Sequence, residues 1–134
     1  MTKKPKKLKP LKTLRNKAWS LMSEYSRLKD SNRDGMVKCV TCETVKHWKE
    51  MHAGHFFHGS KQRPISYDDR NIHAQCSGCN LYGGGKRDHY SVYVIRRYGS
   101  MAPEELRTLK LSGKEMRLID LEEMIALQEA RLSL

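Results

Sequence analysis

The chain has 134 residues, of which 38% are hydrophobic and 31% charged, and its formal net charge is +11. This length fits one domain with a modest apolar core, which at this size is often supported by a metal or a partner subunit. The positive charge favours a polyanionic partner, with nucleic acid ahead of an anionic membrane. No apolar stretch approaches the roughly 20 residues that span a bilayer, and no secretory h-region follows the N-terminus. We therefore expect a cytoplasmic protein without membrane attachment.

The N-terminal segment, residues 1–12, contains six lysines and two prolines and almost no apolar residues. This composition predicts a disordered basic arm, either contacting DNA phosphates or serving as a solubilising tail. Thr13 suits an N-cap, and a helix should follow it, since apolar residues then recur at helical spacing: Leu14, Ala18, Leu21, Met22, Tyr25 and Leu28. Residues 30–35 end this helix. We assign 13–134 to one domain.

The rest of the chain alternates short extended segments with helices. Residues 37–44 predict a short strand and tight turn, 47–56 a second strand, and 71–75 a further extended piece. A helix should begin near Cys76 or Ser77 and carry Asn80. Residues 86–98 predict a helix ended by Gly99, and shorter and longer helices should occupy about 103–110 and 114–132. The predicted class is α+β, and the C-terminal helix either closes the core or forms a homodimer interface.

Four cysteines form two C-x-x-C pairs, Cys39 with Cys42 and Cys76 with Cys79, separated by 33 residues. In a reducing compartment, four thiolates in this arrangement favour a tetrahedral structural Zn²⁺ over disulfides. Since all four ligands come from the protein, this zinc would have no open position for chemistry. The pattern predicts a metal site strongly but identifies function poorly.

Between and after the cysteine pairs lie the motifs A-G-H at 53–55, D-D-R-N-I-H-A-Q-C at 68–76 and C-S-G-C-N at 76–80, with a trailing Tyr90 and I-R-R-Y-G at 95–99. Residues 39–99 thereby resemble the NinG (Rap) recombination-endonuclease family of lambdoid phages, within the HNH superfamily. The resemblance implies a ββα-metal core at about 37–99, flanked by the N-terminal helix and the helices of 100–134. It also implies a DNA endonuclease acting on branched recombination intermediates such as D-loops or Holliday junctions.

The HNH letters fall on His55, Asn71 and Asn80, and each has a chemical reason. His55 is the general base by its place in the motif, since an unperturbed histidine titrates near neutral pH. Asn71 is expected to orient the His55 ring by hydrogen bonding. Asn80 offers an amide oxygen to a catalytic Mg²⁺ or Mn²⁺, beside the zinc ligand Cys79.

One departure from the HNH pattern concerns the catalytic metal ligand. Many HNH proteins place Asp or His directly before the base, where this chain has Gly54. The NinG family typically carries Asp three positions before the base, where this chain has His52. Both positions share one face of a strand, so we expect His52 to serve as the ligand.

Several basic residues are candidate phosphate contacts beside the site: Lys61, Arg63, Arg70, Lys86 and Arg87. A solvated loop is the alternative for the first three. For His73 we favour local packing over a DNA contact. Two other functions remain open: a non-catalytic zinc-dependent DNA-binding module, and an HNH nuclease acting on linear duplex DNA.

Overall fold

The computed structural model describes residues 11–134, and the predicted α+β class is confirmed. The helices and strands, in chain order, are α1 (Leu11–Leu28), β1 (Met36–Lys38), β2 (Val45–His47), β3 (His52–His55), β4 (Ile72–Gln75), α2 (Arg87–Tyr98), α3 (Ala102–Leu111) and α4 (Leu118–Leu132). Two 3₁₀ turns, Trp48–Glu50 and Pro64–Tyr67, and one π-helical turn, Gly78–Tyr82, complete the regular structure of this region.

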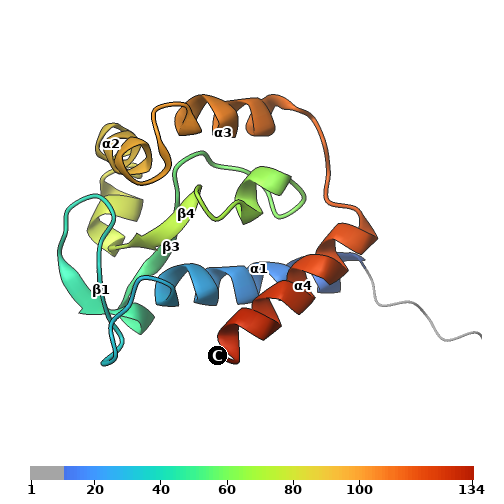
Figure 1. The fold of residues 1–134 in the computed structure, drawn as a ribbon, viewed down its shortest axis with the longest axis horizontal. Coiled ribbons are helices and arrows are strands. Elements are labelled where there is room, and N and C mark those ends of the chain that lie inside the picture. The colour runs from blue at the N-terminus through green and yellow to red at the C-terminus, as the bar shows by residue number, and fades with distance from the viewer. Residues whose placement is uncertain (1–10) are drawn as a thin grey trace, which may run out of the picture.

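The antiparallel pair β3–β4 lies between two layers of helices, with α1 and α4 on one side and α2 and α3 on the other (Figure 1). His52 is paired with Gln75, and His55 with Ile72. Because side chains alternate along a strand, His52 and His55 leave β3 on opposite faces. His55 faces α1, whereas His52 lies on the face that is continued by the π-helical turn.

Two apolar clusters hold the layers together. Ala18 and Met22 of α1 are fully buried and pack with Ile72 of β4 and with Leu121 and Ile125 of α4. Burying one large apolar side chain of this kind stabilises the fold by about 1.5–3 kcal/mol. On the other side, a second cluster joins α2 and α3 to the segment between β3 and β4: Phe56, Ile65, Tyr90, Val94, Ala102 and Leu106.

A separate hairpin, β1–β2, carries the first cysteine pair in its turn. The predicted strand over 47–56 is wrong in extent, because the 3₁₀ turn Trp48–Glu50 divides it into β2 and β3. The Val40 N–H donates to the Ala74 carbonyl at 2.9 Å and so joins this hairpin to β4. The first cysteine pair is thereby held beside the second.

The predicted helix boundaries differ from the structure at both ends of the chain. Leu11 and Lys12 already belong to α1, so Thr13 is not its N-cap; the remainder of the expected arm, residues 1–10, lies outside the described residues. The last helix begins at Leu118 rather than at 114. Its start is capped by Asp120, whose Oδ2 accepts a hydrogen bond from the Arg117 backbone N–H at 2.8 Å. The predicted helix before Gly99 is confirmed. No helix within residues 11–134 has the length and apolar character of a membrane span.

Candidate metal centre and active site

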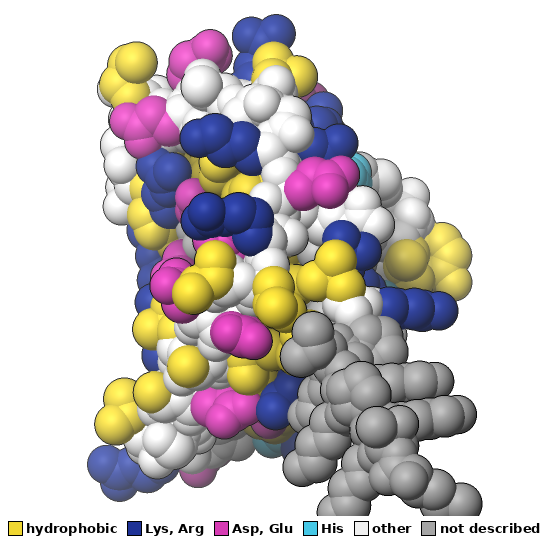
Figure 2. Space-filling view, turned by 90° about the vertical axis from the view of Figure 1, so that its right-hand side faces the viewer, with side chains coloured by type: hydrophobic (Ala, Val, Ile, Leu, Met, Phe, Trp, Pro, Cys, Tyr) yellow, Lys and Arg dark blue, Asp and Glu magenta, His cyan; other side chains and the backbone are white. Residues whose placement is uncertain are grey.

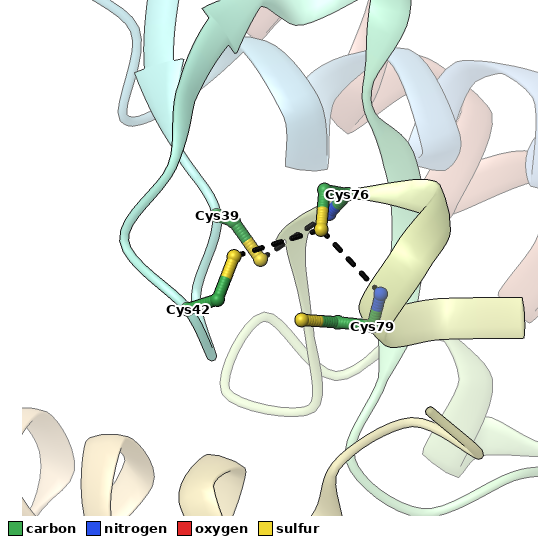
Figure 3. Close-up of side chains that lie close together, drawn as sticks. All are labelled: Cys39, Cys42, Cys76 and Cys79. Atoms are coloured by element: carbon green, nitrogen blue, oxygen red, sulfur yellow. Dashed lines mark hydrogen bonds between the residues drawn. The ribbon is translucent and has the colours of Figure 1, made fainter. Parts of the chain in front are cut away.

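The four cysteines form one cluster, with Cys39 and Cys42 approaching from the β1–β2 turn and Cys76 and Cys79 from the end of β4 and the π-helical turn (Figure 3). Their Sγ atoms all lie within 4.8 Å of one another, and those of Cys42 and Cys76 are 3.6 Å apart. A tetrahedral Zn²⁺ with Zn–S bonds of about 2.3 Å separates its sulfurs by about 3.8 Å. The cluster therefore has the size and the donor set to hold a metal such as zinc, as predicted.

Hydrogen bonds support the thiolate form of Cys39 in this cluster. The N–H groups of Cys76 and Cys79 donate to the sulfurs of Cys39 and Cys76 at 3.3 and 3.4 Å. Burial raises the pKa of the Cys39 thiol, but the hydrogen bonds from the Cys76 N–H and the Thr41 hydroxyl outweigh it and bring the pKa down to about 6. Burial instead raises the pKa of the Cys76 and Cys79 thiols, so a bound cation is what would bring all four sulfurs into the thiolate form that metal ligation needs.

His52 and Asn80, predicted to share a catalytic metal, are in contact: His52 Nδ1 lies 3.1 Å from Asn80 Nδ2. The Asn80 backbone N–H donates to the Cys76 carbonyl at 2.9 Å, so the cysteine cluster fixes where the amide projects. Rotation of the amide by 180° presents Oδ1 in place of Nδ2. Apart from the four cysteines, no group of three or more His, Cys, Asp or Glu side chains in residues 11–134 is placed to hold a metal.

Gly54 has a steric role that the sequence did not indicate. A Cβ at this position would lie 2.1 Å from Gln75 Oε1 and 2.6 Å from Gln75 Cβ. The Gln75 side chain is fully buried, and its Nε2 donates to Thr41 Oγ1 at 3.1 Å and to the Gly85 carbonyl at 2.9 Å. A glycine at position 54, where many HNH proteins carry Asp or His, therefore leaves room for Gln75. The Gln75 side chain in turn links the turn that carries Cys39 and Cys42 to the segment of glycines 83–85.

His55 lies at the end of β3, and its ring is fixed from two sides. It stacks on the indole of Trp19 in α1, and its Nε2 lies 3.2 Å from the Ser66 carbonyl oxygen. Because a carbonyl oxygen only accepts, Nε2 carries the proton and Nδ1 keeps its lone pair. Burial lowers the pKa of His55 below its usual 6.5, which favours the neutral ring. His55 borders a cavity of about 310 Å³ lined by Trp19, Gly59, Ser60, Lys61 and Ser66.

Asn71 does not make the hydrogen bond to the His55 ring that we expected. It is fully buried; its Oδ1 accepts from the Phe57 N–H at 2.8 Å, and its Nδ2 donates to the carbonyls of Phe57 and Ile65, both at 2.9 Å. These bonds close the loop between β3 and β4. Asn71 therefore acts on His55 only indirectly: it holds the loop whose Ser66 carbonyl contacts the His55 ring.

His73 connects three of the sequence motifs, and its expected packing role is confirmed. The Tyr90 hydroxyl donates to the Gly54 carbonyl at 2.7 Å, so its oxygen accepts from His73 Nδ1 at 2.9 Å. His73 Nε2 must then accept from the Tyr98 hydroxyl, 2.7 Å away. Burial lowers the pKa of His73 to about 2, which keeps the ring neutral.

Three of the five candidate phosphate contacts are placed by weak or local interactions. Lys61 Nζ donates to Asn16 Oδ1 at 3.2 Å, beside the cavity that His55 borders. Arg63 donates to the Lys114 carbonyl at 3.1 Å. Lys86 precedes α2 in a left-handed conformation, with φ of 47°. The face in Figure 2, at the α3–α4 connection, carries acidic and basic side chains intermixed, so the positive charge is not concentrated there.

The other two candidate contacts, Arg70 and Arg87, have different partners within the protein. Arg70 forms ion pairs with Asp68, at 3.1 Å, and with Glu105. Its charge is thus compensated within the protein, which weakens the expectation that it contacts DNA. The Arg87 guanidinium, at the start of α2, lies over the Phe57 ring, 5.4 Å from the centroid.

The scaffold and the cysteine cluster define a small α+β protein with a metal-binding centre of the paired C-x-x-C type. A family model described as "Bacteriophage Lambda NinG protein" matches residues 1–133, and the chain belongs to this family. The family predicted from the motifs is thus confirmed.

Curated relatives agree with this membership. The ninG proteins of Escherichia phage 933W and Salmonella phage P22 are each 33% identical to this chain over 76 residues, and that of Escherichia phage lambda is 32% identical over the same length. These matches cover 57% of this chain but only 37% of each relative. No solved structure matches the chain.

Proposed function

We propose that this chain is a metal-dependent DNA endonuclease of the HNH class, acting on branched recombination intermediates such as D-loops and Holliday junctions. The observation that supports it most is the setting of His55: burial favours its neutral form, Nε2 is turned to the Ser66 carbonyl, and Nδ1 has no hydrogen-bond partner among residues 11–134. A neutral imidazole that borders a cavity and keeps one ring nitrogen unprotonated is what a general base requires. The order β3, β4 and then a helical turn carrying Asn80 agrees with a ββα-metal core.

In this proposal each residue has a separate task, and the scissile phosphate lies at the edge of β3, between His55 on one face and the His52–Asn80 pair on the other. His55 Nδ1 accepts the proton of the attacking water, and Ser66 holds the ring in the required tautomer. His52 and Asn80 would hold a Mg²⁺ or Mn²⁺, with the remaining ligands supplied by water and the substrate phosphate. When bound, such a cation stabilises negative charge on the phosphate and on the departing 3′ oxygen. The four cysteines hold a structural zinc that positions Asn80.

The test is cleavage of matched linear, D-loop and four-way-junction DNA, with and without Mg²⁺ or Mn²⁺. His55→Ala should lower the single-turnover rate by about 10²- to 10⁴-fold, the usual contribution of a general base. Zinc content, thermal stability and DNA affinity should stay close to wild type. His89→Ala, which changes an exposed histidine of α2, is the matched control and should cut normally. If His55→Ala cuts as fast as wild type, the HNH assignment is wrong.

Two further variants test the proposed cation ligands. Asn80→Ala should abolish turnover at low metal concentration, and excess divalent metal should restore part of it, because a ligand has been lost. His52→Asp should stay active and shift its preference from Mn²⁺ towards Mg²⁺, since a carboxylate is the harder ligand. Unchanged metal dependence in both variants would place the cation elsewhere.

A second candidate function is a non-catalytic zinc-dependent DNA-binding module, which the net charge of +11 and the cysteine cluster also support. Tight DNA binding without cleavage under any metal condition would favour it. Equal cleavage of linear and branched substrates would instead favour an HNH nuclease of linear duplex. The candidate homodimer surface is formed by three exposed residues of α4: Leu118, Ile119 and Leu127. Sedimentation of the full chain, which gives its mass in solution, would test it.

A further inference from the structure

Two large apolar side chains project into solvent directly after Asn80. Leu81 is 63% exposed and Tyr82 is 89% exposed, the largest value for a large hydrophobic side chain in residues 11–133. Both belong to the π-helical turn that also carries Cys79 and Asn80. They therefore stand one and two residues beyond the side chain that contacts His52.

This turn is held by several backbone hydrogen bonds, so the exposed pair has a fixed base. The N–H groups of Gly83 and Gly85 donate to the carbonyls of Gly78 and Cys79 at 2.8 and 2.9 Å. Cys79 is in turn part of the metal-type cluster. Leu81 and Tyr82 consequently project from a rigid turn rather than from a long loop.

The surroundings of the pair favour an anionic partner. A Cβ on Gly83 would lie 2.7 Å from Lys86 Cε, so the Lys86 side chain lies alongside the turn. Arg87 follows at the start of α2. Gly84 would have no heavy atom within 4 Å of a Cβ, which leaves its backbone open to a close approach. An apolar pair on a turn with the Lys86 side chain alongside it fits a base with its phosphate better than an apolar protein surface.

We propose that Leu81 and Tyr82 form a wedge that stacks on an unpaired or unstacked base of DNA bound at the His52–Asn80 site. Aromatic side chains stack on any base, and apolar wedges enter steps where stacking is already broken. A continuous duplex must first unstack, which costs a few kcal/mol per step. The wedge therefore selects branch points and gaps over linear duplex. This inference rests on the proposed DNA-binding function and adds the element that distinguishes the substrates.

The test measures binding without cleavage, on a His55→Ala background of the full zinc-loaded chain, with no added divalent cation. The probes are a four-way junction with 2-aminopurine at the branch point and a linear duplex of the same sequence. Tyr82→Ala should weaken junction binding by about 5- to 150-fold, the range expected for one lost stacking contact. Linear duplex binding should change by less than about twofold, because a continuous duplex offers no free base face for Tyr82 to stack on.

Two controls make the result specific. Tyr82→Phe keeps the ring and should retain junction binding together with the change in 2-aminopurine fluorescence. Leu111→Ala removes a side chain that is 67% exposed at the end of α3, and it should bind both probes like the parent. The wedge is overturned if Tyr82→Ala weakens both probes equally or neither, or if Tyr82→Phe loses as much as Tyr82→Ala.

The outcomes separate this inference from the proposed function. If the parent binds the junction but Tyr82→Ala has no junction-specific effect, only the wedge fails. If Tyr82→Ala shows the effect but the wild-type chain cuts no DNA with any metal, the wedge stands and the nuclease proposal fails. If the parent binds neither probe, both are overturned.

Discussion

The indole of Trp19 in α1 lies nearly parallel to the imidazole of His55 in β3, with ring centroids 5.0 Å apart and an interplanar angle of 19°. The stack covers one face of the imidazole and adds to the burial that lowers its pKa. It also restricts rotation of the ring, while the Ser66 carbonyl fixes its tautomer. The N-terminal helix thus takes part in the candidate active site.

The first prediction concerns the pH dependence of cleavage. If His55 is the base, only its unprotonated form is active, so the rate must rise with pH through the pKa. Since burial lowers that pKa below 6.5, the midpoint of the pH–rate profile should lie below 6.5, and the rate should level off above it. Single-turnover rates between about pH 5 and pH 8 measure it. A midpoint above 6.5, or one that moves when Mn²⁺ replaces Mg²⁺, would assign the titration to another group.

The second prediction concerns Trp19 itself. Trp19→Ala opens one face of the ring to water, so the pKa of His55 should rise towards 6.5 and the cleavage midpoint should move up with it. Trp19→Phe keeps an aromatic face and should leave the midpoint nearly unchanged. Trp48→Ala is the matched control, because it removes the other tryptophan, which packs near the cysteine cluster. Trp48→Ala should lower thermal stability without moving the pH midpoint of cleavage. A shift of that pH midpoint equal to the shift in Trp19→Ala would contradict the stacking role.

The third prediction concerns Gly54. Gly54→Ala places a methyl group 2.1 Å from the buried Gln75 Oε1, and forced overpacking of this kind costs about 1–3 kcal/mol of unfolding free energy. Gly78→Ala is the matched control, since its Cβ would meet nothing closer than 3.8 Å. Urea denaturation of both variants gives the comparison. Equal stability of the two would mean that Gln75 moves aside without cost.

The fourth prediction concerns the cysteine cluster. The purified chain should contain one Zn²⁺, and chelation should lower its thermal midpoint, because metal binding adds directly to folding free energy. Cys76→Ser should lose both the metal and much of the stability, whereas Ser77→Ala, at the neighbouring position, should keep both. Elemental analysis gives the zinc content, and well-folded protein without zinc would end this assignment.

The sequence predicted those parts of the site that depend on local spacing. Two C-x-x-C pairs already define four ligands, and Asn80 directly follows the last of them, Cys79. The proximity of Asn80 to the metal cluster could therefore be predicted without knowledge of the fold. The helix predicted over residues 86–98 forms over Arg87–Tyr98, and its predicted end at Gly99 is confirmed by the φ of 105° at that glycine.

The contacts that the sequence did not predict join segments far apart in the chain. The partner of His55 is a backbone carbonyl in an irregular loop, and a carbonyl leaves no mark in the residue type at position 66. Trp19 has the helical spacing of a core residue, and nothing in its own segment points to β3. Gln75 fills the space above Gly54 only because β3 and β4 pair in one particular register.

The hydrogen bonds from Tyr98 through His73 and Tyr90 to the Gly54 carbonyl all run in one direction, and this has a consequence for how the family can vary. Changing any single member leaves a buried donor or acceptor without a partner, at a cost of about 1–3 kcal/mol. Replacing all of them with apolar groups of similar shape removes that penalty. Drift at positions 73, 90 and 98 should therefore be concerted, and chimaeras that take β4 from one relative and α2 from another should fold poorly unless these three residues come from the same parent.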